Sequence, residues 1–425
     1  MSKYLYLVVG IFISTTFGYI LFTNSQNIPS FDDYDATLAF IRNFYFEKST
    51  DPERLGMLFD LHNEHCIMIS RLSASIYYAI FKEINFTHLV LYQNLFLLGF
   101  YAVILAIMKQ QNLLSPLAAL FVTIFLFSLS FWQVSFYYWA GIQHYTVLFF
   151  SFLSLFLLSK AEKPNGKYFI LACLFASLAI FSFGNGVLAL FLGGFLLFVQ
   201  KKKSALVVWI VVSLLLLSFL YFSRTTGNGS EAEAFNFEWM GRLLFTFLGS
   251  FLFVNPPDIF WYKANIIFCM ITGLAVLSCW IVLFLNGYAF KNPLLYVLFS
   301  FPILTGIVIA ISRFSTKAAG GIAPRYMFFT ATIPVILLLI LLDMGFLKKR
   351  VLQYITFSAF LVWSLSFNNN LKVLKQSNEE LMISVKKSEN NKDIPLINGG
   401  NGLDYSAKLH WAIENNVIKI PKYEE

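Results

Sequence analysis

Three aspartates lie close together in residues 29–40, PSFDDYDATLAF, directly after an apolar N-terminal segment. Ser30 and Asp33 have the spacing of a capping box, in which a hydroxyl and a carboxylate bind free backbone N–H groups at a helix start. That role does not need three acids. A carboxylate whose pKa is raised by a neighbouring acid and by desolvation is suited to act as a general base on a sugar hydroxyl. We therefore predict Asp32 and Asp33 as candidate catalytic residues and Asp35 as a candidate ligand-binding residue.

A second polar cluster lies in residues 60–72, DLHNEHCIMISRL. If this segment is helical, Glu64 and Arg71 share one face, and His62 and His65 share another. A solvated helix start with a Glu–Arg pair explains this pattern, whereas a zinc site would lack the usual H-E-x-x-H spacing. The remaining interpretation is the recognition of sugar hydroxyls or phosphate beside a membrane. Its candidate residues are His62, Asn63, Glu64, His65 and Arg71.

Three cations stand near the end of an apolar run, in RFSTKAAGGIAPR at residues 313–325. A charge at the centre of a membrane helix costs about 2.5–3.5 kcal/mol on insertion scales, so cations at span ends need a reason. One reason is snorkelling to lipid headgroups. The other is a clamp on the phosphate of a polyprenyl phosphate or pyrophosphate, because guanidinium groups bind phosphate well. The candidates for phosphate binding are Arg313, Arg325 and Lys317.

Two further stretches place polar side chains at membrane depth, namely FYYWAGIQH (136–144) and SFGNGVLAL (182–190). Polar groups at that depth must find partners, so each one either joins two helices or lines a cavity. The aromatic side chains either stack on a sugar or form an interfacial belt. The candidates from these stretches are Tyr138, Gln143, His144 and Asn185.

Membrane-spanning helices must position these candidates. Hydrophobic residues make up 58% of the 425 residues and charged residues 13%, about half the charge of an ordinary soluble domain. Apolar runs of about twenty residues recur, which is the length that crosses about 30 Å of hydrocarbon as a helix. The sequence predicts an all-α polytopic membrane protein with about eleven spans. These spans are 4–22, 89–108, 113–132, 144–159, 167–182, 186–200, 204–222, 264–286, 293–311, 326–342 and 350–366.

The basic residues orient these spans. They lie in alternate short connections, which the positive-inside rule assigns to the cytoplasm. They are Lys109; Lys160, Lys163 and Lys167; Lys201, Lys202 and Lys203; Lys291; and Lys348, Lys349 and Arg350. The N-terminus is then cytoplasmic, and the candidate residues share the outer side with the C-terminus. The net charge of +8 is therefore a topology signal, and we expect no nucleic-acid partner.

We expect a transmembrane domain at residues 1–366 and a polar outer tail or small appendage at residues 367–425. Within the first part, residues 24–87 form a long outer loop with amphipathic helices that lie in the membrane interface. The apolar piece at 240–254 is too short to cross and is interpreted as interfacial or re-entrant. In the tail, residues 405–423 have the spacing of a short helix and a strand-like end. The four cysteines give no disulfide framework.

A first span, an acidic pair at the start of a long outer loop, interfacial helices and many further spans together resemble the GT-C class of membrane glycosyltransferases. More narrowly, the chain resembles the serotype-converting O-antigen glucosyltransferases and related proteins that carry an NEHR stretch. Here that stretch is NEHC (63–66), with Arg71 further on, so a role for an arginine at position 66 does not carry over. FGNG (183–186) and RY (325–326) are also similar to recurring features of these proteins. The likeness in architecture covers the whole chain, whereas each motif is short.

The resemblance implies the inverting transfer of a sugar, such as glucose, from a polyprenyl-phosphate donor to a periplasmic glycan such as O-antigen. It implies that Asp32, with Asp33 beside it, acts as the base. Arg313 and Arg325 would bind the departing phosphate, with Lys317 as a further candidate. Cationic side chains can replace a metal in this role, so we expect no metal and no other cofactor. The expected location is a bacterial inner membrane, and the expected partners are membrane lipids, a donor synthase and a flippase.

Two other functions remain open for a multi-span chain with a phosphate site. A flippase or transporter of lipid-linked sugar is expected to show internal repeats and ionisable residues at the membrane midplane. We find no repeat, and the charges gather on one side. An O-antigen polymerase or ligase is expected to carry its large outer loop late in the chain, whereas here the first loop is the largest. A sugar attached inside each repeat unit would separate a transferase from both alternatives.

Overall fold

The computed structural model describes residues 3–47, 50–62, 65–222, 235–391, 393–396 and 402–421 of the chain. Over these residues the regular structure is helical, apart from one antiparallel hairpin of β1 (Leu61–His62) and β2 (His65–Cys66) and an isolated bridge between Ile84 and Ile418. The prediction of an all-α polytopic membrane protein is confirmed in this general form.

Eight helical segments of the described chain are long and apolar enough to cross a membrane. They are α1 (Lys3–Asn24), α4 (Phe86–Gln110), the pair α5 (Pro116–Leu126) and α6 (Trp132–Phe136) with η3 (Leu129–Phe131) between them, α7 (Tyr138–Lys160), α10 (Lys203–Phe222), α12 (Ile259–Leu285), α14 (Pro293–Arg313) and α16 (Lys349–Asn390). Three other predicted spans are shorter apolar helices, namely α8 (Lys167–Ile180), α9 (Val187–Val199) and α15 (Met327–Asp343). The count of eleven spans depends on these three and stays a prediction.

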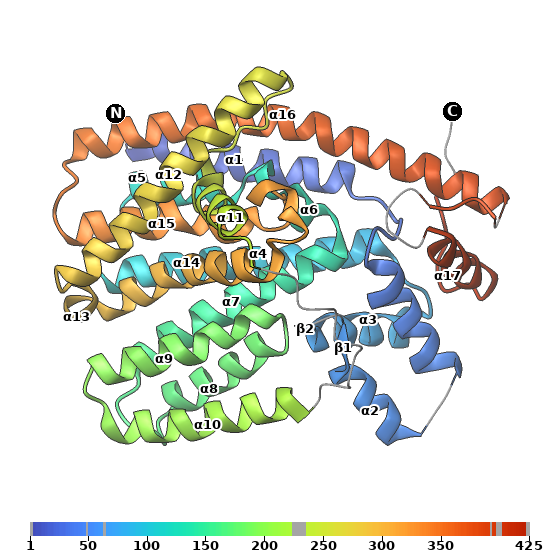
Figure 1. Cartoon of the computed structure of the whole chain (residues 1–425), viewed down its shortest axis with the longest axis horizontal. Helices are drawn as coiled ribbons and strands as arrows, with labels where there is room; N and C mark the ends of the chain where they lie inside the picture. Colours follow the sequence, from blue (N-terminus) through green and yellow to red (C-terminus); the bar gives the residue numbers. More distant parts are fainter. Residues whose placement is uncertain are drawn as a thin grey trace.

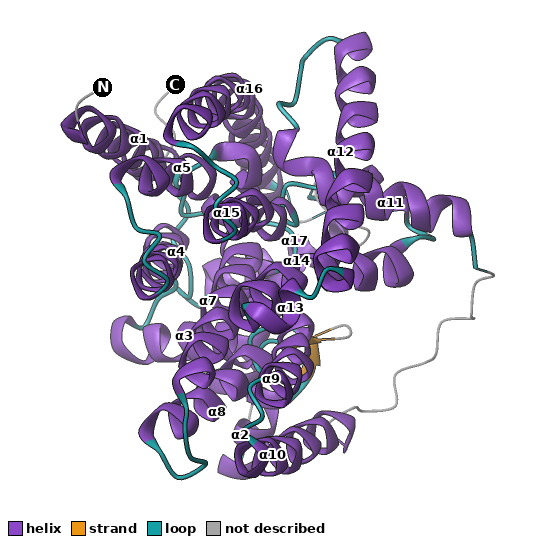
Figure 2. Cartoon of the chain, turned by 90° about the vertical axis from the view of Figure 1, so that its left-hand side faces the viewer, coloured by secondary structure: helices purple, strands orange, loops and turns teal. Residues whose placement is uncertain are grey.

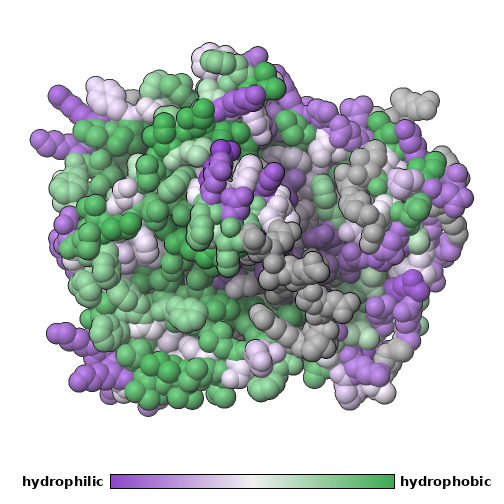
Figure 3. Space-filling view, in the orientation of Figure 1, coloured by the Kyte–Doolittle hydropathy of each residue, from purple (hydrophilic) through white to green (hydrophobic). Residues whose placement is uncertain are grey.

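The helices lie side by side around α7, which runs through the middle of the bundle (Figures 1 and 2). The apolar stretch of α7 is 83% buried, whereas that of α1 is 22% buried and that of α10 is 11% buried. Helices α4, α6, α8 and α9 pack directly on α7. The outer helices keep apolar side chains on their exposed faces, which form the broad hydrophobic surface in Figure 3. Such a surface suits lipid, because lipid chains are as apolar as these side chains.

The polar elements gather at one end of the bundle, on the right in Figure 1. They are the π-helices η1 (Tyr34–Ala39) and η2 (Arg42–Glu47), α2 (Asp51–Phe59), the β1–β2 hairpin, α3 (Met68–Phe81) and α17 (Gly402–Glu414). The turns from α9 to α10 and from α15 to α16, together with α13 (Tyr288–Lys291), lie at the opposite end. These three connections are among the basic ones in the sequence. They therefore share one end of the bundle, as the alternating charge pattern predicts.

The structure corrects the helix expected across residues 60–66. This segment forms the β1–β2 hairpin, and α3 begins only at Met68. The buried guanidinium of Arg71 on α3 donates hydrogen bonds to the backbone oxygens of Met57 (2.9 Å) and Asp60. These bonds tie the end of α2 to α3, and the chain between them turns back as a hairpin instead of continuing as a helix.

The two histidines predicted to share a helix face do lie together, but they do so because the hairpin pairs them. His62 and His65 are partners across the two strands, and this places them together without helical spacing. Asn63 and Glu64 lie outside the described residues. The predicted pair of Glu64 with Arg71 therefore lies outside them too.

The C-terminal tail begins as a continuation of the last span. Helix α16 runs without a break for 42 residues, so the boundary expected at residue 366 falls inside a helix. The short helix predicted in the tail is confirmed as α17. Beyond it, Ile418 forms a parallel bridge with Ile84, where the sequence predicts a strand-like end.

The apolar piece predicted at 240–254 is α11 (Phe237–Gly249) followed by η5 (Ser250–Leu252). Helix α11 has 13 residues, which is below the length of a membrane span. It packs on α12 through two glycines that allow the backbones to approach. A methyl group at Gly273 of α12 would lie 1.8 Å from the backbone oxygen of Phe245, and one at Gly249 would lie 1.9 Å from that of Cys269.

Gly273→Ala should destabilise the bundle, because the added methyl group must push α11 and α12 apart. Overpacking of this kind costs about 1–3 kcal/mol. Gly18→Ala on α1 is the matched control, since a methyl group there meets no atom within 4 Å. Thermal unfolding in detergent should show a lower midpoint for Gly273→Ala and little change for Gly18→Ala. Equal midpoints for the two variants would contradict the close helix contact.

Candidate functional site

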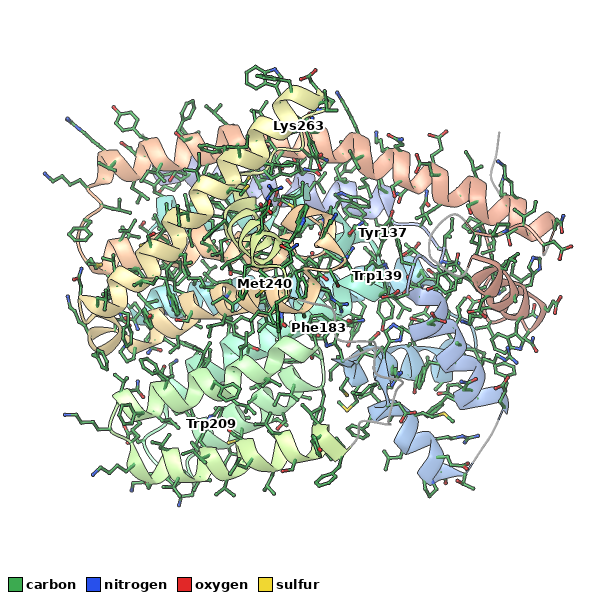
Figure 4. All side chains as sticks on the ribbon, in the orientation of Figure 1. Tyr137, Trp139, Phe183, Trp209, Met240 and Lys263 are labelled. Atoms are coloured by element: carbon green, nitrogen blue, oxygen red, sulfur yellow. The ribbon has the colours of Figure 1, made fainter. Side chains whose placement is uncertain are left out.

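A polar cavity of about 390 Å³ lies at the N-terminal end of α7. It is bounded by the segment before η1, the β1–β2 hairpin, the first turns of α7, η4 (Gly184–Gly186) and the chain on either side of η6 (Lys317–Gly321). Its lining residues are Phe31, Asp32, His62, His65, Trp139, Gln143, His144, Phe183, Asn185, Val308, Ile309, Ser312, Arg313, Thr316, Arg325 and Tyr326. Trp139 and Phe183, labelled in Figure 4, mark the place where these elements meet. A cavity of this size suits a small-molecule ligand.

Among the described lining residues, Asp32 is the one with a carboxylate, and it follows Phe31, whose backbone is unusual. Phe31 has a φ of 46°, in the left-handed region that bulky residues rarely adopt. Its ring lies against those of Tyr137 and Trp139, with centroids 5.9 and 5.6 Å away. The Asp32 side chain is 40% exposed, and its Oδ2 lies 3.9 Å from Nε2 of His62. An exposed carboxylate beside an imidazole can accept a proton from a bound hydroxyl.

Asp33, the next residue, is buried and does not line the cavity. Its carboxyl accepts hydrogen bonds from the backbone N–H and the hydroxyl of Ser30, both at 3.1 Å. One of the two bonds of the predicted capping box is therefore present, namely the one from the Ser30 N–H group to the Asp33 carboxyl. The other is absent, because the Ser30 hydroxyl binds the Asp33 carboxyl and not a backbone N–H group. Burial raises the pKa of Asp33 to about 8, against the lowering effect of the bonds from Ser30. The geometry thus separates Asp33, a structural anchor, from Asp32, an accessible acid.

Arg313 and Arg325 form the cationic part of the cavity. Arg313 ends α14, Arg325 precedes α15, and the hydroxyl-bearing residues Ser312 and Thr316 line the cavity beside them. The Arg325 guanidinium lies over the ring of Tyr326 at 4.9 Å and forms no ion pair with any acid in the described ranges. Its charge is therefore available to an anionic ligand.

Several buried nitrogen atoms of the cavity residues have no hydrogen-bond partner among the residues that the structure describes. They are Nε2 of His62, Nε1 of Trp139, Nε2 of His144 and Nδ2 of Asn185. Nδ1 of His144 lies 2.6 Å from the backbone oxygen of Ala140, so it donates there and leaves Nε2 as an acceptor. A buried polar atom without a partner costs about 1–3 kcal/mol, so folded proteins seldom leave one. A mixture of donors and an acceptor suits sugar hydroxyls, which do both.

Phe183 joins three elements at the cavity (Figure 4). Its ring centroid lies 4.4 Å from that of His65 on β2 and 5.0 Å from that of His144 on α7. A methyl group at Gly184 would lie 2.5 Å from Nδ1 of His65. The FGNG stretch therefore needs a glycine at 184, because the His65 ring packs directly against its backbone.

Polar side chains of α4 hold the start of α7. Gln93 donates a hydrogen bond from Nε2 to the backbone oxygen of Tyr137 (3.3 Å), and Asn94 donates to that of Ser135 (2.8 Å). These bonds satisfy carbonyl groups at the break between α6 and α7, which water cannot do inside a membrane. A methyl group at Gly141 would lie 2.0 Å from Nε2 of Gln93, so this glycine keeps the two helices in contact.

Two predicted site residues have structural contacts away from the cavity. Arg71 is bound to the end of α2, as described above. The hydroxyl of Tyr138 donates to the backbone oxygen of Ser70 at 2.9 Å and joins α7 to α3. Neither residue lines the cavity, and the aromatic neighbour that does is Trp139.

Two more predicted residues, Lys317 and Asp35, are also outside the cavity lining. The Lys317 ammonium group lies 4.9 Å from the ring centroid of Trp239 on α11. Asp35 forms an ion pair with Lys408 of α17. Their partners are distant in the sequence, so local spacing could not reveal them.

The structure brings together most of the remaining candidates. They are Asp32, His62, His65, Gln143, His144, Asn185, Arg313 and Arg325. It adds residues that the sequence did not single out, namely Phe31, Phe183, Val308, Ile309, Ser312, Thr316 and Tyr326. Phe183 and Tyr326 belong to the FGNG and RY stretches, which were the available signal for them.

Among the described residues, no group of three His, Cys, Asp or Glu side chains is placed to hold a metal ion. The four cysteines, Cys66, Cys173, Cys269 and Cys279, are free thiols.

An apolar groove of about 320 Å³ lies between α9, α12 and α14, and it shares α14 with the cavity. Its lining residues are Phe191, Leu192, Phe195, Trp280, Ile281, Phe284, Tyr296, Ser300 and Leu304. Leu304 in the groove and Val308 in the cavity are four residues apart on α14, so they share one face of that helix. The groove therefore continues the line of the cavity along α14.

Comparisons of the chain with protein-family models, with curated proteins and with solved structures found no match. The function must therefore be argued from the cavity and from the elements that build it.

Buried Asp33 should make the folded protein less stable as pH rises. Its pKa increases from the ordinary value of 3.8 to about 8 on folding, so between these pH values only the folded state holds the proton. Stability falls with pH wherever the folded state binds more protons. Asp33→Asn keeps a neutral acceptor for the Ser30 N–H group and should lose less stability over this interval. Unfolding midpoints across this pH range test the prediction, and parallel curves for both proteins would contradict it.

Proposed function

We propose that the chain is an inverting membrane glycosyltransferase, which moves a sugar such as glucose from a polyprenyl-phosphate donor to a hydroxyl group of a glycan acceptor. The observation that carries the proposal is the composition of one cavity. An accessible carboxylate, Asp32, shares it with the guanidinium groups of Arg313 and Arg325 and with unpartnered polar nitrogen atoms. Transfer from a phosphate donor needs a base for the acceptor, cations for the phosphate and partners for the hydroxyl groups.

In the proposed reaction the acceptor oxygen attacks the anomeric carbon of the donor sugar from the face opposite to the phosphate. The new carbon–oxygen bond forms as the bond between the anomeric carbon and the phosphate oxygen breaks, which inverts the configuration. The acceptor proton passes to Asp32, and the electron pair of the broken bond leaves with the polyprenyl phosphate. Arg313 and Arg325 stabilise the negative charge that develops on this phosphate.

The apolar groove along α14 supports a donor with a lipid tail. Aromatic and aliphatic side chains line nearly all of it, and it continues the line of the cavity. A polyprenyl chain could lie in this groove while its phosphate binds Arg313 at the end of the same helix. Such an arrangement keeps the lipid in an apolar environment and presents only the sugar phosphate to the polar residues.

The two ends of the bundle support a site on the outer side of a bacterial inner membrane. The basic connections lie at the end opposite to the polar elements, and the positive-inside rule assigns that end to the cytoplasm. The acceptor would then be a periplasmic glycan such as O-antigen. A donor synthase and a flippase would supply the lipid-linked sugar.

Asp32→Asn should remove most of the transfer activity, because an amide cannot accept the proton of the attacking hydroxyl. Loss of a general base lowers turnover by about 10²- to 10⁴-fold. Transfer of labelled sugar from its polyprenyl phosphate, measured with purified protein in liposomes, tests this. Asp51→Asn is the matched control, since the Asp51 side chain is 99% exposed on α2 and outside the cavity.

Full turnover by a correctly folded Asp32→Asn protein would end the assignment of Asp32 as the base. A wild-type protein that moves lipid-linked sugar across the bilayer and forms no glycosidic bond would instead be a transporter. Joining of whole glycan chains end to end would identify a polymerase or ligase.

Arg325→Ala should weaken the binding of polyprenyl phosphate by about ten- to hundredfold, because a hydrogen bond to a charged group contributes about 1.5–3 kcal/mol. Titration of the intrinsic tryptophan fluorescence can follow this binding, since Trp139 lines the same cavity. Arg242→Ala is the matched control, because Arg242 pairs with Glu238 on the surface of α11. An unchanged affinity of Arg325→Ala would leave only a headgroup contact for this arginine.

A further inference from the structure

The C-terminal part of the chain returns to the segment that carries Asp32. We use the term C-terminal arm for residues 367–390 of α16 together with residues 402–421. Helix α17 of this arm packs beside η1 at the right-hand end of Figure 1. We propose that the arm holds the Asp32 carboxylate in the cavity and that Lys408 is the positioning residue through which it does so. The proposal rests on the proposed role of Asp32 as the base.

Lys408 links the arm to the segment by binding two carboxylates at once. One belongs to Asp35 on η1, and the other belongs to Asp404, one turn earlier on α17. Burial alone would lower the pKa of Lys408, but the two carboxylates outweigh it and raise the pKa, so the ammonium group stays charged. Its side chain is only 18% exposed, so water screens these ion pairs less than it screens a surface pair. The contact therefore holds Asp35, which is the third residue after Asp32.

Ring contacts extend the same interface. Tyr405 of α17 stacks on Tyr34, the residue before Asp35, with centroids 4.8 Å apart and an angle of 15° between the rings. Further along α17, Trp411 meets the ring of Phe46 edge-on at 5.1 Å. Helix α17 thus contacts both η1 and η2, and Tyr34 and Tyr405 are buried where they meet.

The arm also contacts the segment on the other side of Asp32. Ser377 of α16 hydrogen bonds through its hydroxyl to that of Tyr137 (2.9 Å), and the Tyr137 ring lies against Phe31. Nearby, Asn378 donates to the backbone oxygen of Asn24 at the end of α1 (2.8 Å). The residues immediately before and shortly after Asp32 are therefore both held by contacts that lead to the C-terminal arm.

The backbone of Phe31 explains why such support matters. A bulky residue with a positive φ is strained and persists only when its surroundings hold it, and Phe31 has a φ of 46°. If the arm loosens, Phe31 can return to an ordinary conformation, and Asp32 then leaves its place beside His62. The arginines belong to other elements, because Arg313 ends α14 and Arg325 precedes α15.

Lys408→Ala should therefore lower kcat for sugar transfer about tenfold while KM for the donor stays within about twofold of wild type, because a small misplacement of a catalytic group is costly. Lys408→Arg keeps the charge and should recover most of the turnover. Lys419→Ala is the matched control in the same arm, since Lys419 is 73% exposed and pairs with Glu83 outside the cavity. A smaller folded fraction would lower the apparent kcat in the same way and leave KM unchanged, so kcat is normalised to the amount of folded protein measured for each variant.

A charge exchange tests the pairing itself. Asp35→Lys alone brings a second cation against Lys408 and should lower kcat. Combining it with Lys408→Asp restores an ion pair of opposite sign between positions 35 and 408, although the new acid lies one turn from Asp404. The double variant should therefore recover part of the lost turnover. Additive losses in the double variant would overturn the direct pairing.

Amide hydrogen exchange measures local opening of the backbone and does not depend on activity. In Lys408→Ala, backbone amides of residues 33–37 should exchange faster, while those of the buried helix α7 should not change. Unchanged exchange at 33–37 would overturn the holding role of the arm. Faster exchange with an unchanged kcat would overturn the positioning role. A wild-type protein without transfer activity would refute the proposed function and the positioning role with it, whereas exchange would still decide whether the arm holds the segment.

Discussion

The turn closed by Ser30 and Asp33 is the constraint on which the site depends. The buried Asp33 carboxyl binds two groups of Ser30, and its raised pKa keeps it protonated near neutral pH. With both ends of the turn held inside the protein, Phe31 takes a left-handed conformation and Asp32 lies in the cavity. One acid is thus neutral and structural, and its neighbour lines the cavity. Two adjacent carboxylates acquire different roles because only one of them is desolvated.

The second requirement is polar chemistry inside an apolar bundle. Helix α7 is the most deeply buried span compared above, yet it carries Gln143 and His144 into the cavity. This is tolerated because α4 supplies Gln93 and Asn94 to the broken backbone before α7, so the cost of unpaired carbonyl groups is avoided. Four of the buried nitrogen atoms without partners belong to cavity residues, where a ligand rich in oxygen atoms would satisfy them.

Segments from near the two ends of the sequence meet beside the site. Asp35 and Lys408 are 373 residues apart in the sequence, and their contact closes the polar end of the bundle around the segment with Asp32. The C-terminal tail has a polar composition, and its described part packs on this segment through these contacts. Helix α16 extends from the last span to the polar end of the bundle as one long helix. The cationic side of the cavity comes from a different part of the chain, so the acid and the cations are positioned independently.

The sequence by itself determined the membrane class and predicted about half of the residues that line the candidate cavity. Long apolar runs leave no alternative to helices in hydrocarbon, because backbone groups there can bind only each other. Unusual acids and cations at the span ends then identified Asp32, Arg313 and Arg325. Only the tertiary structure decided that residues 61–66 form a hairpin, and that Asp35, like Arg71, Tyr138 and Lys317, has a partner outside the cavity. The physical reason is that these outcomes depend on tertiary contacts, such as those of Arg71 with the end of α2 and of Asp35 with Lys408, whereas helical spacing describes only the faces of one helix.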